Sequence, residues 1–193
     1  MATQKQRSES TRSKLIGAFR ASFLERGFEA TTTELILKET GFSKGALYHH
    51  FKSKTEVMEA IYERESQSAI DDAFRSVDAA APALERLREA CLAWLDRVRA
   101  SDVSQILFEI GPAALGPRRV KQLEDQFSIV AFETLLEEAT DQGEASYQST
   151  ALIANILNSL MAEVAIHEHV TGEDTKADVA KMIDAILKTG GVA

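Results

Sequence analysis

Residues 28–54 read FEATTTELILKETGFSKGALYHHFKSK and hold the clearest structural pattern in the sequence. Its apolar spacing and its capping residues predict two short helices, 32–40 and 43–51, joined by a tight turn at Gly41-Phe42. Two helices joined in this way are typical of a helix-turn-helix, whose second helix enters the major groove of DNA. We therefore interpret 32–51 as a helix-turn-helix motif; the alternative is a surface helical hairpin with ordinary caps.

The side chains of this motif suit contact with DNA. Gly45 and Ala46 keep the leading end of the second helix narrow, so that its backbone can approach base edges. Threonine hydroxyls and free helix amides at 31–33 lie where a phosphate can bind, and the helix dipole favours its charge. Side chains that can contact phosphates as charges or hydrogen-bond donors are Lys44, Tyr48, His49, Lys52 and Lys54. Side chains expected to face inward and hold the two helices together are Phe42, Leu47 and Phe51.

The segments around the motif are helical as well, and no stretch alternates with the period of a strand. A first helix, with Leu15, Ile16, Phe19 and Phe23 on one face, is predicted to end at Gly27 in a left-handed cap. Capping boxes are predicted at 31–34 and at 53–56, and the second opens a helix over 54–76. Further helices are expected from Pro82 to about 98, from Ser101 to Gly111-Pro112, from Gly116-Pro117 to Gly143, over 147–170 and over 174–189. About nine helices and no strands predict an all-α fold.

The charge of the chain is unevenly distributed. Among 193 residues, 22 Lys and Arg stand against 30 Asp and Glu, which gives a net charge of −8. This total argues against a partner as acidic as DNA. Residues 1–54, however, hold ten basic and five acidic side chains, whereas the remaining residues hold twelve and 25. Because the basic part coincides with the candidate motif, the distribution of charge favours DNA binding although the total opposes it.

The single cysteine and the histidines predict no metal or disulfide chemistry. Cys91 is alone, so an intramolecular disulfide and a cysteine-based zinc site are excluded. It occupies an apolar position and is interpreted as a small buried hydrophobe, with a redox-sensing thiol as the alternative. Glu163 and His167 can share a helix face, but His169 lies well around the helix, so no metal site is expected.

Residues 28–36 and 41–54 resemble the DNA-binding domain of the tetracycline-repressor-like (TetR) transcriptional regulators. The resemblance covers about 9–69 and implies a three-helix DNA-binding domain there, followed by a helical ligand-binding and dimerisation domain over 70–193. By position, Lys44, Gly45 and Ala46 are similar to the groove-facing residues of the family. The full set of DNA-binding residues expected is Thr32, Thr33, Ser43, Lys44, Gly45, Ala46, Tyr48, His49 and Lys54.

Two positions depart from the family pattern. Leu37 and Thr40 stand where the family usually has alanine, at the packing seam of the helix-turn-helix. The bulkier Leu37 is expected to change how the motif docks on DNA, but it does not change the assignment of the motif as a helix-turn-helix. Outside the motif, only 105–116 is similar to a segment of some members' regulatory domains, and it identifies no effector.

A small-molecule pocket is expected in the second domain, around 84–110, 120–135 and 152–167. Its apolar lining favours a lipophilic or aromatic ligand, and Trp94 is either a core residue or a side chain that stacks on this ligand. The candidate pocket residues are Cys91, Trp94, Phe108, Phe127, Asn155 and His167. No cofactor is expected beside this unknown effector.

The helix 147–170 carries two distinct stripes. The expected core stripe is Ile153, Ile156, Leu157, Leu160 and Val164. A second stripe of small and polar residues is Ala151, Asn155, Asn158, Ala162 and Ala165. Small side chains permit close helix approach, so the second stripe favours a subunit interface or a polar pocket wall. The resemblance implies a homodimer through 147–170 and 174–189.

No membrane segment is expected. Residues 1–14 lack the apolar region of a signal peptide, and the uncharged run 145–162 carries too many polar side chains for a lipid-facing helix. We therefore expect a cytoplasmic protein.

Together these features predict a dimeric, ligand-responsive transcriptional repressor. A ligand would tilt the helix 54–76 and so release the protein from a palindromic operator. The alternatives are a DNA-binding protein of the same fold that acts in chromosome organisation, and an activator. An enzyme is not expected, because the sequence offers neither a nucleophile–base pair nor a metal triad.

Overall fold

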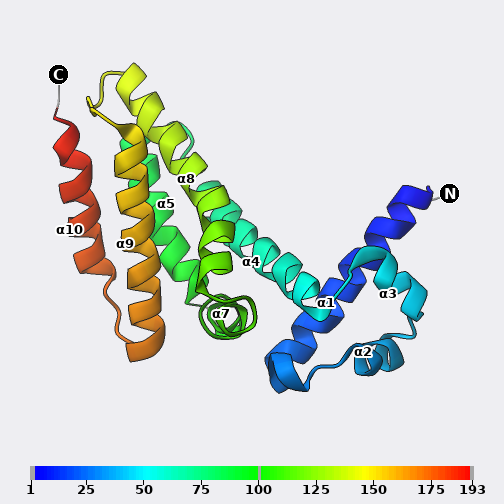
Figure 1. Ribbon diagram of the computed structural model, residues 1–193. Coiled ribbons are helices and arrows are strands. Elements are labelled where there is room, and N and C mark those ends of the chain that lie inside the picture. The colour runs from blue at the N-terminus through cyan, green and yellow to red at the C-terminus, as the bar shows by residue number, and fades with distance from the viewer. Residues whose placement is uncertain (1–2, 100, 192–193) are drawn as a thin grey trace. The chain divides into compact units, whose positions relative to one another are not determined.

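The computed structural model describes residues 3–99 and 101–191, except for the side chain of Ser101. The described residues contain helices and no strand, so the all-α fold is confirmed (Figure 1). The elements in chain order are α1 (Gln4–Ala30), α2 (Thr33–Thr40), α3 (Lys44–His50), α4 (Lys54–Ser76), α5 (Ala83–Val98), α6 (Ser101–Ser104), the π-helical segment η1 (Gln105–Ile110), α7 (Gly111–Leu115), α8 (Pro117–Asp141), α9 (Thr150–Thr171), α10 (Lys176–Leu187) and the 3-10 turn η2 (Lys188–Gly190).

The helices form two compact units. The first unit comprises the residues up to Glu65 together with Gln105–Val120, and the second comprises Ser66–Ser104 and the residues from Lys121 onward. The sequence placed a single boundary between 69 and 70. The units differ from that division because η1 packs on α1 and Gly111 packs on Tyr62 of α4, which joins 105–120 to the N-terminal helices.

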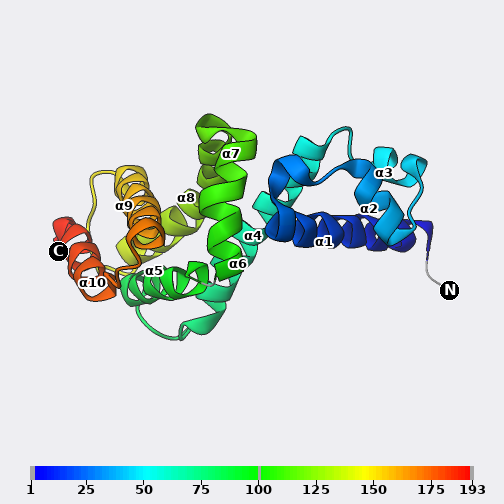
Figure 2. The same cartoon turned by 90° about the horizontal axis from the view of Figure 1, so that it is seen from below.

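The first unit is built on α1, against which α2 and α3 pack (Figure 2). The apolar face expected for the first helix is buried, with Leu15, Phe19 and Phe23 at 0% exposure. From the α3 side, Leu47 and Phe51 are buried and Phe42 is half-buried. The inward-facing residues of the motif therefore form the core that holds its two helices in place.

α1 ends three residues later than the sequence indicated. Gly27 has φ 82° and ψ 168°, a positive but extended conformation, and the helix resumes across this kink as far as Ala30. Thr31 closes the turn, because its hydroxyl donates to the carbonyl oxygen of Gly27 at 2.9 Å and lies 3.0 Å from Oγ of Ser22. The left-handed cap expected at Gly27 is therefore wrong, although the positive φ explains the glycine.

The two predicted capping boxes form only in part. Thr32 caps α2, because its hydroxyl accepts from the amide of Leu35 at 3.2 Å. The Glu34 carboxylate accepts from the hydroxyl of Thr33, and the return bond of a capping box to the amide of the capping residue is not formed. At α4, Ser53 accepts from the amide of Glu56 at 3.1 Å, and the Glu56 carboxylate accepts from the amide of Lys52, one residue before the expected position. Both helices thus begin where the caps predicted.

The helix expected to end at Gly111-Pro112 continues to Leu115. The preceding six residues form a π-helical segment, after which Pro112 stands in the first turn of α7, where its missing N–H costs nothing. A Cβ added to Gly111 would lie 2.5 Å from Cδ2 of Tyr62 and 2.7 Å from the carbonyl oxygen of Ile106. The glycine therefore serves a close packing contact and not a helix end.

In the second unit, α5, α9 and α10 pack together, and α8 lies beside them in Figure 1. Glu144 caps α5 from a distant position, since its carboxylate accepts from the amides of Ala83 at 2.8 Å and Leu84 at 3.0 Å. At the other end of α5, Arg99 donates to both carboxylate oxygens of the buried Glu168, at 2.8 and 2.7 Å. These polar contacts join the start of α5 to the segment before α9, and the end of α5 to the last turns of α9.

The core stripe of α9 differs from the expected one. The buried residues are Ala154, Leu157, Met161, Ala165 and Glu168, so Leu157 alone of the expected core stripe is fully buried. Ile156 is 42% exposed, and Ala165, assigned to the second stripe, lies in the core. α9 packs against α5 and α10, and two of its five buried positions are alanines, whose small side chains permit a close approach of helices.

Candidate nucleic-acid interface

The exposed face of α3 is set by local interactions at both of its ends. Gly41 adopts a left-handed conformation (φ 71°, ψ 9°) that ends α2, and Ser43 caps α3 by accepting from the amide of Ala46 at 3.1 Å. With Leu47 turned into the core, Lys44, Gly45, Tyr48 and His49 lie on the exposed side. Tyr48 is 51% exposed although it is large and aromatic, so it is available to a partner.

The threonines at the start of α2 are already engaged within the chain. Thr32 is exposed and uses its hydroxyl as the helix cap, while the hydroxyl of Thr33 donates to the Glu34 carboxylate at 3.1 Å. The same carboxylate lies 3.7 Å from Nζ of Lys44. The first turns of α2 and α3 therefore meet at one side of the motif.

Lys54 has a structural environment that sequence reasoning did not indicate. Its ammonium donates to the carbonyl oxygen of Phe28 at 2.7 Å and lies 4.2 Å from the centre of the Phe28 ring. These contacts tie the start of α4 to the turn before α2. A phosphate contact for Lys54 stays a prediction.

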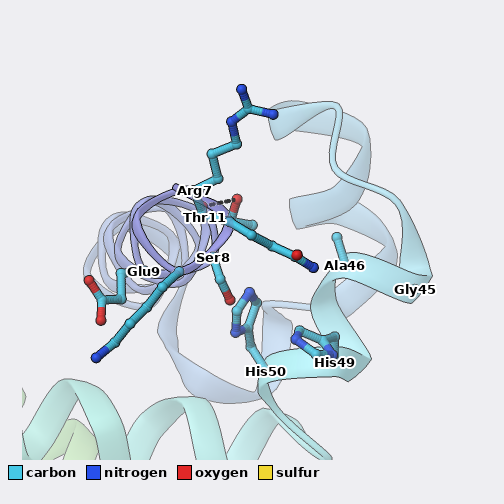
Figure 3. Close-up of a pocket in the computed structure, with 10 residues that line it drawn as sticks. Arg7, Ser8, Glu9, Thr11, Gly45, Ala46, His49 and His50 are labelled. Carbon is cyan, nitrogen blue, oxygen red and sulfur yellow. Dashed lines mark hydrogen bonds between the residues drawn. The ribbon is translucent and has the colours of Figure 1, made fainter. Parts of the chain in front are cut away.

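An open groove of about 820 Å³ runs between the start of α1 and α3 (Figure 3). From α3 it is lined by Gly45, Ala46, His49 and His50, and the first three are candidate DNA-binding residues. Figure 3 shows Arg7 extending away from the two histidines. The residues that α1 contributes are Gln4, Lys5, Arg7, Ser8, Glu9 and Thr11.

The α1 side of this groove was missed by motif-based reasoning. The only sequence signal for it is the basic excess of 1–54, to which Lys5 and Arg7 contribute. The structure brings these residues beside α3, so the basic surface extends beyond the helix-turn-helix.

The adjacent histidines of α3 have different surroundings. His49 is exposed, whereas His50 is half-buried and its ring stands edge-on to that of His49, with centroids 5.0 Å apart. Burial, and then the charges of His49 and Arg12, lower the pKa of His50. His50 is therefore neutral near pH 7, and His49 is the histidine that faces solvent.

The two departures from the family pattern are accommodated locally. Thr40 is half-buried, and its hydroxyl donates to the carbonyl oxygen of Ile36 at 2.6 Å. Leu37 is half-buried and its carbonyl oxygen accepts from the amide of Gly41 at 3.0 Å. The turn between α2 and α3 keeps its hydrogen bond despite the larger side chain.

The candidate ligand-pocket residues have different surroundings. Phe108 belongs to the first unit, whereas the other five belong to the second. Cys91 is buried in α5, and burial raises the pKa of its thiol to about 12. Asn155 and His167 lie on the exposed side of α9, where His167 Nε2 is 3.0 Å from the Glu173 carboxylate. The side chains that are half-buried are Trp94, Phe108 and Phe127. The pocket stays a prediction.

The histidine and carboxylate positions offer no metal centre in the described part of the chain: no group of three or more His, Cys, Asp or Glu could hold an ion there.

The chain was compared with known protein families. Residues 15–61 match the model of the bacterial regulatory proteins of the tetR family, and residues 84–189 match the tetracyclin repressor-like C-terminal domain. The second match alone spans more than half of the chain. The chain belongs to the TetR family. It is a helix-turn-helix transcriptional regulator, and the family is one of regulatory proteins and not of enzymes.

Individual relatives match along different shares of the chain. An uncharacterized HTH-type transcriptional regulator of Bacillus subtilis, YfiR, is 26% identical over 191 residues, covering 94% of this chain and 90% of its own. The nucleoid occlusion factor SlmA of Actinobacillus pleuropneumoniae is 41% identical over 64 residues, 33% of this chain and 30% of SlmA.

Solved TetR-family structures share the fold. A TetR-family transcriptional regulator of Pectobacterium atrosepticum superimposes with a TM-score of 0.78 at 22% identity, over 100% of this chain and 99% of the other. The SmeT–triclosan complex superimposes with a TM-score of 0.69 at 26% identity, over 95% and 94% of the two chains.

Proposed function

We propose that this TetR-family regulator is a homodimeric repressor that binds a palindromic operator and is released by a small molecule. The observation that carries the proposal is the exposed face of α3, where Lys44, Gly45 and Tyr48 stand free of the core beside the basic start of α1. Two such helices in one dimer would need a separation of about 34–36 Å to enter successive major grooves.

The dimer is proposed to form through α9 and α10. α9 is long and apolar enough to cross a membrane by length and composition alone, yet only 22% of its apolar window is buried within the chain. Its exposed apolar residues share one face at helical spacing, as expected of a helix that packs on a partner helix. These residues are Leu152, Ile156, Ile166 and Val170, and Met182 adds an exposed side chain on α10.

Val170→Glu tests this interface, because Val170 is the most exposed of these side chains at 76%. The variant is expected to be monomeric by size-exclusion chromatography with light scattering, since a carboxylate cannot be buried there without a partner. Val130→Glu on α8 is the control: Val130 is 60% exposed and lies outside the proposed interface, so this variant should remain dimeric. A dimeric Val170→Glu or a monomeric Val130→Glu contradicts the assignment.

Release by a small molecule is supported by the SmeT–triclosan complex, in which a protein of this fold holds an aromatic ligand. A ligand can change operator affinity only through different affinities for two arrangements of the chain. In a thermal-shift screen of lipophilic and aromatic compounds, an effector is expected to raise the melting temperature and to lower operator affinity. A compound that does the first without the second is not an effector.

DNA binding is tested by Lys44→Ala combined with Tyr48→Phe. Using the DNA upstream of the protein's own gene in a gel-shift assay, we expect about tenfold weaker binding, because the variant loses one charged and one hydrogen-bonding contact to DNA. Lys121→Ala, an equally exposed lysine on α8, is the control and should bind as the unmodified protein does. Unchanged affinity of the double variant would refute the assignment of α3.

A role in chromosome organisation is the second candidate, because the SlmA match is the most identical of those described here. That match covers 33% of this chain and 30% of SlmA, so it says nothing of the rest of either protein. Mapping the bound genomic sites distinguishes the two: one promoter beside the protein's own gene supports a transcriptional role, and many scattered sites support chromosome organisation. A promoter-reporter assay with the gene deleted separates a repressor from an activator.

A further inference from the structure

Glu34 lies among the groups that the motif directs at DNA. Its carboxylate accepts from the hydroxyl of Thr33 at 3.1 Å and lies 3.7 Å from Nζ of Lys44. Both Thr33 and Lys44 are candidate DNA-binding residues. The carboxylate thus occupies the space between two groups that would otherwise be available to a phosphate.

The carboxylate is ionised at neutral pH and accessible. Its own backbone amide, the Thr33 hydroxyl and the charge of Lys44 lower the pKa of Glu34, in that order of size. The side chains of Glu34 and Lys44 are 66% and 69% exposed, so either can exchange its partner for a group on DNA. An acidic side chain is unfavourable on a surface that meets phosphates unless it has a specific role there.

We propose that the Glu34 carboxylate takes the place of a DNA phosphate beside Lys44 and Thr33. It thereby weakens the binding of the protein to DNA of arbitrary sequence. The inference rests on the proposed DNA-binding function. In non-specific binding, Lys44 and Thr33 must leave Glu34 to reach phosphates, and the freed carboxylate then faces the duplex. In operator binding, Lys44 reaches base edges in the groove and can remain beside Glu34, which holds its ammonium away from the backbone. Glu34 is therefore a positioning residue for Lys44.

The arrangement has a measurable consequence for counterions. A lysine that neutralises one phosphate releases about 0.9 of a cation, which sets the salt dependence of binding. When Lys44 leaves Glu34 for a phosphate, the negative charge of the freed carboxylate remains beside the duplex and offsets most of this neutralisation, so fewer cations are released. Removing the charge of Glu34 should therefore steepen the salt dependence for random DNA by up to about one unit of slope.

The test compares Glu34→Gln with Glu25→Gln, which removes the same charge from a side chain of matching exposure, 67%, that pairs with Arg26. Fluorescence anisotropy over a KCl series measures affinity for short duplexes of random sequence and for an operator selected by the unmodified protein from a randomised pool. Circular dichroism checks that both variants fold.

Glu34→Gln is expected to bind random duplexes about two- to fivefold more tightly, because Lys44 no longer has to leave an exposed ion pair to reach a phosphate. The affinity for the operator should change less. Glu25→Gln should alter neither. In a Lys44→Gln background, Glu34→Gln should lose most of its effect, because the carboxylate acts through Lys44.

Two results overturn the inference while leaving DNA binding intact. One is that Glu34→Gln matches Glu25→Gln in every measurement. The other is that it weakens operator binding without tightening random binding, which would mean that Glu34 reads a base. If the unmodified protein binds no duplex and selects no operator, the proposed function itself fails, and the inference with it.

Discussion

Replacing Gly111 by alanine tests how the segment 105–115 packs on α4. A Cβ at this position lies 2.5 Å from Cδ2 of Tyr62 and 2.7 Å from the carbonyl oxygen of Ile106. The oxygen belongs to the backbone of η1, and Tyr62 is 0% exposed, so neither neighbour can move aside without disturbing the core. The substitution should therefore destabilise the first unit, although alanine ordinarily favours a helix.

The magnitude follows from the cost of adding a methyl group to a filled site, about 1–3 kcal/mol. In a chain of this size, 1 kcal/mol corresponds to about 2–4 °C of melting temperature, so a decrease of roughly 2–12 °C is expected. Differential scanning calorimetry or circular dichroism measures it.

Gly17→Ala is the matched control. Gly17 lies in α1 of the same unit, and a Cβ there meets nothing within 4 Å. This substitution should be neutral or should stabilise the protein by up to about 1 kcal/mol. Combining Gly111→Ala with Tyr62→Leu should cost less than the sum of the two single variants, because the smaller side chain relieves one clash. If Gly111→Ala melts at or above the temperature of the unmodified protein, the close packing on Tyr62 is refuted.

Three further predictions concern polar and titratable groups. Although burial raises it, hydrogen bonds from Arg99 and Thr175 lower the pKa of Glu168 to about 2. Its stabilising effect is therefore complete above pH 4.5 and is lost as the pH falls toward 2; Glu168→Gln should cost about 1–3 kcal/mol at pH 7 and much less near pH 2, as measured by urea unfolding. Equal losses at both pH values would contradict this. Lys54→Met should destabilise the first unit by about 1 kcal/mol without DNA present, because it removes the hydrogen bond to Phe28; an unchanged melting temperature argues that Lys54 acts on DNA alone. Burial raises the pKa of the Cys91 thiol to about 12, so the native protein should react with a disulfide reagent only as fast as it unfolds. Rapid labelling of Cys91 in the folded protein would instead support a redox-sensing role for this thiol.

Much of the motif could be predicted from the sequence because its geometry is local. Ser43 caps α3, Gly41 ends α2 and Leu47 turns inward, each through contacts with residues at most four positions away or through helical periodicity. The same reasoning was wrong at Gly27 and at Gly111, where a glycine was taken for a helix end. Glycine also allows a kink or a close contact, and only the surrounding chain distinguishes these uses.

The candidate site could be predicted less completely, because its remaining contacts join distant parts of the chain. The basic start of α1 lines the groove beside α3, and Lys54 is held by Phe28, 26 positions earlier. Neither arrangement has a signal in the spacing of residues. The buried face of α9 was likewise misassigned, since it combines Leu157 from one predicted stripe and Ala165 from the other with residues of neither.

The helical fold class, the helix-turn-helix and the family could be inferred from the amino-acid sequence, because caps, turns and apolar periodicity act over a few residues. Which side chains remain free to meet DNA, and which are already engaged within the chain, depends on the packing of the helices. Thr33 and Lys44 meet at Glu34, and the segment 105–120 joins the N-terminal helices through Tyr62. Such contacts depend on how helices pack, and packing is decided by the fit of side chains across the whole unit.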